Sequence, residues 1–284
     1  MKTLLLLAEL VKFEHTLFAL PFAYMGAWLG AGGPPKLSTA LWILLAMIGA
    51  RTSAMAFNRL ADARIDAKNP RTSARPIPSG RMSAGGAWTA WALFVILFFV
   101  AAYKLNTLAL MLSPLALVII HFYSYTKRFT SASHLVLGLS LAIAPIGGWI
   151  AVTGHFSLEA LLLGGGVLFW VAGFDCLYAC QDEGFDREHG LHSIPSRWGK
   201  TAAFWAARSF HLIAFIFFAA TGWLASMGLF YFAGLILVFL FLSIEHWIIS
   251  PRDLSNLQMS FFTLNAAVSL VLFLATLIDF MSKI

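Results

Sequence analysis

Apolar runs of about 20 residues, the length that crosses a bilayer, recur along the whole chain. Short polar or charged stretches separate them. The pattern predicts nine membrane-spanning helices, at residues 13–32, 38–62, 87–104, 107–125, 134–153, 158–181, 202–224, 229–248 and 257–280. Pro21 and Pro145 fall inside the first and fifth spans. We expect both to kink their helices, because proline lacks the backbone donor and crowds the preceding turn. The pattern is that of an all-α integral membrane protein.

The composition agrees with this prediction and indicates which classes of binding partner to expect. Of the 284 residues, 60% are hydrophobic and 11% are charged. The formal net charge of +6 could indicate nucleic acid, but the basic residues fall in short loops between spans, where membrane topology accounts for them. We therefore expect a lipid bilayer and no nucleic acid as the partner, and no obligate protein partner is evident. Cys176 and Cys180 share one apolar run, which indicates packing and no disulfide framework or zinc site. The first run shows no cleavable signal-peptide pattern.

Lysine and arginine residues are distributed unevenly between the two ends of the spans. The loops after spans two, four, six and eight carry Arg64, Lys68, Arg71, Arg75, Arg81, Lys127, Arg128, Arg187, Arg197, Lys200 and Arg252. The opposite side carries Lys36, Lys104 and Lys283. By the positive-inside rule the first set faces the cytoplasm, together with the N-terminus, and the C-terminus lies outside. We expect a multi-pass protein of the cell's inner (cytoplasmic) membrane.

A polar row stands at the cytoplasmic end of the second span. Asn58, Asp62 and Asp66 are four residues apart, a spacing that places their side chains along one face of a helix. Two carboxylates and an amide oxygen repel one another unless a cation joins them, and hard oxygen ligands of this kind suit Mg²⁺. The alternative is a solvated helix end that happens to be acidic.

A second row repeats the first. Asp182 and Asp186 follow Asp62 and Asp66 by 120 residues each, and an Ile-Pro-Ser triplet follows each row. Four spans lie between the rows, so both rows occupy the same side of the membrane. This spacing predicts two parallel four-helix pseudo-repeats with a ninth helix appended, arranged around a central cavity. We expect the two rows to face each other across the cytoplasmic mouth of that cavity.

Basic residues near the rows favour a polyanion bridged by divalent cations. Arg71 and Arg75 lie five and nine residues beyond Asp66, within reach of the same mouth. Lys127 and Arg128 follow the fourth span on the same side. Arginine can hold phosphate oxygens in a bidentate fork. For Arg128, membrane topology alone is an equally good explanation.

Three further polar residues lie deeper in the spans. Tyr178 and Asp175 stand four and seven residues before Asp182, so they share its helix face. Arg51 stands seven residues before Asn58, which places it about 10 Å deeper. A charge at this depth is costly unless it faces a cavity or a partner. Arg51 therefore either meets an anionic ligand or pairs with Asp175. The histidines lack convergent ligand spacing, and we expect no transition-metal site.

A cavity in the bilayer with apolar walls and a mouth for a diphosphate suits a polyprenyl diphosphate. Ionising its allylic C–O bond requires a stabilised leaving group, and Mg²⁺ and arginine provide this by neutralising negative charge. The resulting allylic cation must be kept from water. A dry pocket lined by aromatic rings excludes solvent and attracts cations to the ring faces.

Three segments of the chain resemble signatures of the UbiA superfamily of intramembrane prenyltransferases. They are the motif Asn-Arg-Leu-Ala-Asp-Ala-Arg-Ile-Asp at residues 58–66 with its continuation at 71–80, a second aspartate motif at 175–186, and the loop after the fourth span at 123–130. The resemblance extends over nearly the whole chain and implies one transmembrane prenyltransferase domain over residues 1–284.

The resemblance also implies roles for individual residues. It implies that Mg²⁺ and the diphosphate are bound by Asn58, Asp62, Asp66, Asp182 and Asp186. It places these four aspartates and Asp175 in catalysis. It implies that substrates are bound by Arg51, Arg71, Arg75, Tyr123, Lys127 and Tyr178, with Arg51 on the carboxylate of the acceptor.

Within the family, the chain resembles the quinone-pathway members that prenylate 4-hydroxybenzoate. The chain departs from their pattern at Arg59, where an Asp is frequent, and in the first span at residues 12–23. Residues 12–23 are more similar to the first span of members that are proposed to prenylate a dihydroxynaphthoate in menaquinone biosynthesis. Either aromatic acid is a candidate acceptor for the polyprenyl group, in ubiquinone- or menaquinone-type quinone biosynthesis.

Two other classes of protein share some of these features. Membrane transporters also have repeats and charges inside the membrane, but their sites lie near the bilayer centre, whereas these acids gather at one surface. An intramembrane phosphatase or a CDP-alcohol-type transferase would also use aspartate and Mg²⁺. Arg51 argues against this class, because these enzymes need no pocket for an aromatic acid.

Overall fold

The computed structural model describes residues 16–283, and all of its regular structure is helical apart from one isolated bridge. In chain order the helices are α2 Thr16–Ala31, α3 Leu37–Ala61, α4 Ala63–Asp66, α5 Ala84–Leu105, α6 Thr107–Thr126, α7 Ser133–Thr153, α8 Leu158–Ala179, α9 Glu183–Glu188, α10 Ile194–Leu224, α11 Leu229–Ile248, α12 Leu257–Met259 and α13 Asn265–Met281. A 3₁₀ turn, Cys180–Asp182, joins α8 to α9, and a π-helical turn, Ser260–Leu264, joins α12 to α13.

The predicted spans are confirmed. Among the described residues, eight helices are long and apolar enough to cross a membrane, and the shorter apolar stretch Phe18–Ala31 accounts for the first span. The predicted start of that span, at residue 13, lies outside the described residues. Ser193 caps the start of α10 and Pro195 occupies its first turn, so a short helical segment precedes the predicted start of the seventh span at residue 202. The chain changes direction at Gly199, which has a φ of 84°.

Small residues bring α2, α7 and α8 close together. A Cβ atom on Gly26 would collide with the carbonyl group of Pro145, and one on Gly138 with the carbonyl group of Leu168. Helices in a membrane associate through such close backbone contacts, because lipid tails remove the hydrophobic drive between them. Pro21 and Pro145 both lie inside helices, and the kinks expected there stay a prediction.

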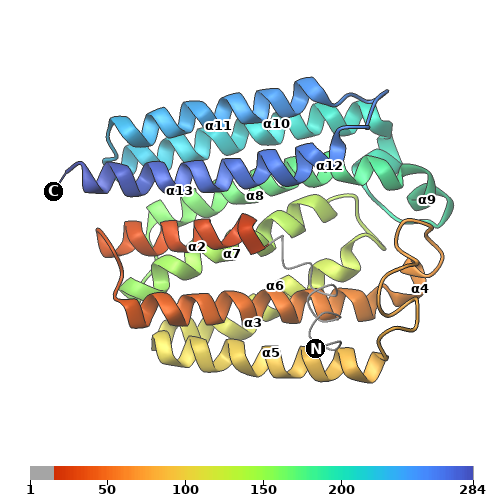
Figure 1. The fold of residues 1–284 in the computed structure, drawn as a ribbon, viewed down its shortest axis with the longest axis horizontal. Coiled ribbons are helices and arrows are strands. Elements are labelled where there is room, and N and C mark those ends of the chain that lie inside the picture. The colour runs from red at the N-terminus through yellow and green to blue at the C-terminus, as the bar shows by residue number, and fades with distance from the viewer. Residues whose placement is uncertain (1–15, 284) are drawn as a thin grey trace.

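The two halves of the chain repeat one arrangement. The helix before each acidic row packs along the next long helix, α3 against α5 and α8 against α10. Asp62 and Asp182 interrupt these helices with the same backbone conformation, φ −97° and ψ 4° in one and φ −98° and ψ 5° in the other. The short helices that follow, α4 and α9, lie at the same end of the bundle (Figure 1). The rows therefore share one side of the membrane.

The halves differ in how they are filled. A cluster of buried apolar residues occupies the space between α2, α8, α10, α11 and α13, and its largest members include Trp170, Tyr231, Phe22 and Phe218. Cys176 and Cys180 are buried and free, as predicted for packing residues. A cavity lies instead among α2, α3, α5, α6, α7 and α8. The packed cluster therefore supports the helices that form the cavity wall.

Candidate active site

One cavity of about 600 Å³ contains all the residues that the sequence singled out. Its polar end is lined by Asn58, Asp62, Asp66, Arg71, Arg75, Lys127, Tyr178, Asp182 and Asp186. Arg51, Tyr123 and Asp175 line its middle, and residues such as Ile43, Leu105 and Phe156 line its apolar end. Segments as far apart in sequence as α3 and α8 therefore build one chamber.

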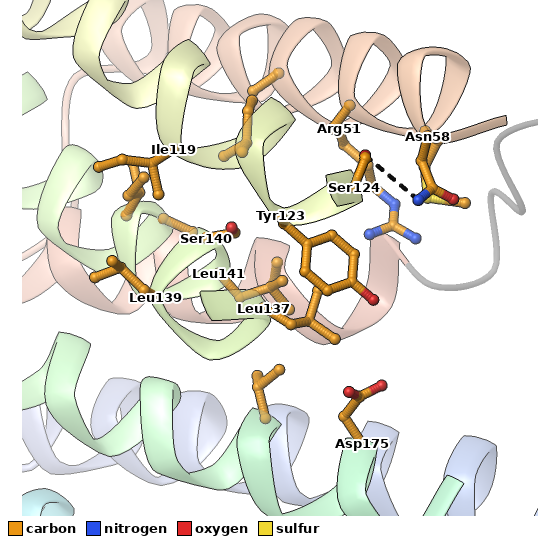
Figure 2. Close-up of a pocket in the computed structure, with 18 of the residues that line it drawn as sticks. Arg51, Asn58, Ile119, Tyr123, Ser124, Leu137, Leu139, Ser140, Leu141 and Asp175 are labelled. Atoms are coloured by element: carbon orange, nitrogen blue, oxygen red, sulfur yellow. Dashed lines mark hydrogen bonds between the residues drawn. The ribbon is translucent and has the colours of Figure 1, made fainter. Parts of the chain in front are cut away.

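The first row is held by residues of α6 and of the following loop. Asn58 Nδ2 donates to Asp62 Oδ2 at 3.1 Å and to Ser124 Oγ at 3.4 Å (Figure 2). Asp62 also accepts from Arg128 Nη2 at 3.1 Å, so Arg128 belongs to the site. Asp66 accepts from Arg75 Nη1 at 2.7 Å with both oxygens.

The prediction of one continuous helix under the first row is wrong. The backbone leaves the α conformation at Asp62, and α4 begins a new short helix that carries Asp66. Asp62 and Asp66 both still line the same chamber.

An arginine from the first half binds the second row. Arg71 donates to Asp182 from Nε at 2.9 Å and from Nη2 at 2.6 Å, as a bidentate pair. Asn69 Nδ2 donates to the same carboxylate at 3.2 Å. Asp186 accepts from Ser193 Oγ at 3.2 Å. Because Arg71 and Asn69 follow the first row in sequence, these bonds place the two rows face to face.

Asp175 has a partner that the sequence analysis missed. Its Oδ2 lies 2.6 Å from Nδ1 of His134, which is fully buried in α7. His134 Nε2 accepts from the backbone N–H of Ile194 at 3.2 Å, so the ring is fixed at both nitrogens and Nδ1 donates to the carboxylate. No local signal marks His134, because both its partners are distant in sequence. The Arg51–Asp175 ion pair, left open as an alternative, is not formed.

Arg51 and Tyr123 point into the space between α3 and α8, toward Asp175 (Figure 2). The Nε atom of Arg51 is buried and has no hydrogen-bond partner within residues 16–283. A buried donor without a partner is costly, since its hydration is lost without compensation. An anionic ligand in the cavity would supply that partner.

The charges at the mouth shift one another's pKa values. Burial raises the pKa of Asp62, and the nearby charge of Asp66 adds to this, although Arg128 opposes it. Burial of Lys127 lowers the pKa of its ammonium, but Tyr123 and the surrounding aspartates outweigh burial, and the net shift is upward. Lys127 therefore stays charged at neutral pH and faces the site as a cation.

The donor set fits a magnesium ion that is shared with a ligand. Within the described part of the chain, no group of three or more His, Cys, Asp or Glu side chains converges to hold a metal by itself. Four carboxylates do line the mouth in two pairs. Mg²⁺ usually takes one or two carboxylates together with substrate phosphates and waters, so paired rows beside arginines suit it without an all-protein cage.

These features define a multi-pass membrane enzyme with a polar mouth for an anion and metal above a deep apolar chamber. Residues 19–273 match the UbiA prenyltransferase family, and the chain belongs to this family. It is therefore a prenyltransferase, and the transporter interpretation is wrong.

Curated relatives and solved structures support this assignment. The 4-hydroxybenzoate octaprenyltransferase of Tolumonas auensis is 29% identical over 247 residues, covering 87% of this chain and 86% of that protein. The protein of the same name from Shewanella sediminis is 29% identical over 275 residues, covering 97% and 96%. An apo UbiA homolog from Aeropyrum pernix is 37% identical, covers 94% of this chain and 98% of that one, and superposes with a TM-score of 0.85.

A more distant structure shares the fold. It is a UbiA homolog from Archaeoglobus fulgidus, bound to GPP and Mg²⁺, with 21% identity, coverage of 96% and 99%, and a TM-score of 0.76. The predicted fold class is thereby confirmed.

Proposed function

We propose that this protein transfers a polyprenyl group from a polyprenyl diphosphate to the ring of an aromatic acid, 4-hydroxybenzoate, in quinone biosynthesis. The observation that carries the proposal is the pair of acidic rows, bridged by Arg71, at the mouth of a deep apolar cavity. The names of the relatives support the acceptor. We further propose that residues 1–284 form one domain and that the mouth faces the cytoplasm across the inner membrane.

The diphosphate would occupy the mouth. Arg71 and Arg75 now neutralise carboxylates, and both can turn their forks to phosphate oxygens when the acids take a metal. Mg²⁺, held by Asn58 and the four aspartates of the rows, would neutralise the charge that develops on the leaving diphosphate. Lys127 adds a fixed positive charge at the same place.

The prenyl chain would lie in the apolar part of the cavity. The lining runs along α3 from Asp62 to Ile43. These residues are separated by about 28 Å of helix, close to the hydrocarbon thickness of a bilayer of about 30 Å. A chamber of this depth suits a long chain and keeps the allylic carbon, at its polar end, away from bulk water.

The acceptor would lie between Arg51 and Asp175. A carboxylate on a planar ring can meet the guanidinium of Arg51 and so direct the ring toward the allylic carbon. Tyr123 borders this space (Figure 2). Asp175, fixed by His134, offers a preorganised negative charge beside the developing cation. A dihydroxynaphthoate carries the same carboxylate and is the alternative acceptor.

The proposal is tested with membranes that contain the protein, Mg²⁺, geranyl diphosphate and a panel of aromatic acids, with products identified by mass spectrometry. We expect a prenylated 4-hydroxybenzoate that disappears when EDTA removes the metal and returns when Mg²⁺ is added. Membranes from the same host without the protein are the control. Product on a dihydroxynaphthoate alone would select the alternative acceptor, and no product on any aromatic acid would contradict the proposal.

A further inference from the structure

A buried polar network lies outside the cavity, in the half of the bundle built by α8, α11 and α13. Its centre is Glu245 of α11, which is 1% exposed. Glu245 Oε1 accepts from Ser260 Oγ at 2.9 Å and from Asn265 Nδ2 at 3.1 Å. Asn265 Oδ1 in turn accepts from Trp170 Nε1 at 2.8 Å. An acid inside the membrane region is costly, and such residues usually have a function.

The network brackets an unusual piece of backbone. Ser260 begins the π-helical turn Ser260–Leu264, and Asn265 is the residue directly after it. Asn265 Nδ2 also lies 3.5 Å from the carbonyl oxygen of Ser260. π-Helical turns are rare in proteins, and those that do occur often lie at functional sites. Glu245 therefore ties the two ends of the turn together through one carboxylate oxygen.

The turn presents Phe261 to the cavity. Phe261 lines the chamber, its ring centroid lies 4.4 Å from that of Tyr178, and it meets Phe174 edge-on at 5.3 Å. The hydroxyl of Tyr178 accepts from Arg71 Nη1 at 3.4 Å. The contacts lead from Phe261 to the arginine that bridges the acidic rows.

We propose that Glu245 is a positioning residue for prenyl transfer, which acts by fixing the π-helical turn so that Phe261 closes the cavity wall beside Tyr178. The inference rests on the proposed function, because the wall matters where an allylic cation forms. If Phe261 moves away, water reaches that carbon. The allylic C–O bond to the diphosphate breaks as in prenyl transfer, and the diphosphate leaves with the bonding electrons. A water oxygen, and not a ring carbon, then bonds to the allylic carbon, one proton passes to solvent, and the product is a free prenol.

Asp279 provides a matched control on the same helix pair. It is a fully buried acid of α13 and accepts from the backbone N–H groups of Gly228 at 2.7 Å and Tyr231 at 3.3 Å. It also pairs with Lys283 at 2.8 Å. Asp279 therefore joins α11 to α13 as Glu245 does, but at the opposite end of these helices and outside the cavity lining.

The experiment measures the ratio of prenol to prenylated acid formed from geranyl diphosphate and 4-hydroxybenzoate. We expect Glu245→Leu to raise this ratio roughly fivefold, because it removes the hydrogen bonds that fix the turn. Phe261→Leu should raise the ratio by a similar factor, because it removes the ring that closes the cavity wall. Glu245→Gln keeps an acceptor oxygen for Ser260 and Asn265 and should restore the parent ratio. Asp279→Leu should lower thermal stability and leave the ratio unchanged. The prenol that membranes without the protein form is subtracted first, so that the ratio reports how the folded enzyme partitions its substrate and does not depend on how much of the enzyme is folded.

Two further measurements complete the test. The double variant Glu245→Leu/Phe261→Leu should show no higher ratio than the single variants, because both changes remove the same wall. Hydrogen exchange of residues 260–265 without substrate should be faster in Glu245→Leu than in the parent or in Asp279→Leu. An active parent with an unchanged ratio in Glu245→Leu, or additive effects in the double variant, would overturn the inference. A parent that forms no prenylated acid would instead refute the proposed function, while hydrogen exchange would still report on the turn.

Discussion

Each aspartate of the two rows accepts a hydrogen bond from a side chain. For Asp66 and Asp186 the donor lies nearby in the sequence, and for Asp62 and Asp182 it comes from a distant segment. Asp182 has Arg71 and Asn69, Asp62 has Arg128, and Asp66 has Arg75 within its own loop. Partly buried carboxylates need such partners, because an unpaired charge away from water is strongly destabilising. The same arginines are the groups that a diphosphate requires. The chain's own basic residues therefore balance the charges of the site's carboxylates.

At the residue scale, Asp182→Asn should lower kcat/KM by on the order of 100-fold or more, because it removes a charge that in the proposed function would hold the metal that stabilises the transition state. The amide keeps the shape of the side chain, so the bundle should stay folded. The matched control is Glu183→Gln, since Glu183 pairs with Arg187 and lies outside the cavity lining. Steady-state kinetics at saturating Mg²⁺ decides the matter. Full turnover in Asp182→Asn would refute the two-row site.

Arg51 is the residue that we propose binds the carboxylate of the acceptor. Arg51→Ala should raise the KM for 4-hydroxybenzoate by roughly 10- to 100-fold, the cost of losing charged hydrogen bonds. The KM for geranyl diphosphate should stay close to the parent value. Arg64→Ala, at an exposed position in α4, should change neither constant. A rise in the diphosphate KM, with phenol and 4-hydroxybenzoate affected alike, would contradict the assignment of Arg51 to the acceptor's carboxylate.

At the scale of elements, α7 combines close packing with open space. Gly138 of α7 meets the backbone of α8, whereas Gly147 lines the cavity and a Cβ there would meet nothing within 4 Å. Gly147 lies 14 residues beyond Ser133, about 21 Å from the polar end of the helix. The face of α7 at this depth should therefore limit the space that is open to the prenyl chain of the proposed donor.

A large side chain at this position should change which lengths of prenyl diphosphate the enzyme accepts. We expect Gly147→Phe to reduce turnover of long polyprenyl diphosphates by roughly tenfold or more, because overfilling the chamber costs binding energy. Geranyl diphosphate should still react, since its short chain ends before this depth. The control is Val118→Phe, at an exposed position of α6 outside the cavity lining. Competition between short and long donors in one reaction measures the effect, and equal losses for both would argue against this path.

At the scale of the whole molecule, the pseudo-repeat decides the chemistry. Each half supplies one acidic row, and Arg71 and Asn69 of the first half bind Asp182 of the second. One half alone would present an acidic helix end with no facing row. The long helices connect so that α4 and α9 come to the same end of the bundle (Figure 1).

This arrangement makes a topological prediction. Single cysteines at Ala74 and Glu188, both exposed after the two rows, should be labelled by a membrane-impermeant maleimide from one side of sealed vesicles. Cysteines at His155 and Ser226, exposed at the other end of the bundle, should be labelled only from the opposite side. Labelling of positions 74 and 188 from different sides would mean that the rows cannot share a cavity.

The two native cysteines of the parent protein should not interfere with this labelling experiment. Cys176 and Cys180 are both buried, so they should react little, and replacing both by alanine removes any residual signal. Right-side-out and inverted vesicles of the same preparation provide the comparison. Labelling of Ala74→Cys in inverted vesicles only would support the proposed cytoplasmic mouth.

Much of the architecture could be predicted from the sequence because the bilayer imposes strong local rules. Apolar runs of fixed length gave the nine spans, and the 120-residue repeat placed both rows at one side. The twelve predicted site residues all line one cavity. Helical spacing indicated which residues of a span share a face, whereas Tyr123 was predicted from the family resemblance and Arg71 and Arg75 from their nearness to the first row. The break at Asp62 was missed, since a row spaced by four also fits an uninterrupted helix.

Only the tertiary structure decided which groups meet. His134 contacts Asp175, which lies 41 residues away in the sequence. Glu245 binds Ser260 and Asn265 at the two ends of a π-helical turn, and the hydrophobic pattern of the sequence does not predict that turn. Such pairings depend on the rotation and depth of neighbouring helices, which packing sets and composition does not. The sequence by itself thus determined the membrane spans, the paired rows and the kind of ligand they suit. The structure determined that Asp175 is held by a histidine, that the Nε atom of Arg51 has no hydrogen-bond partner among the described residues, and that the cavity lies among α2, α3, α5, α6, α7 and α8. These features follow from contacts between distant segments.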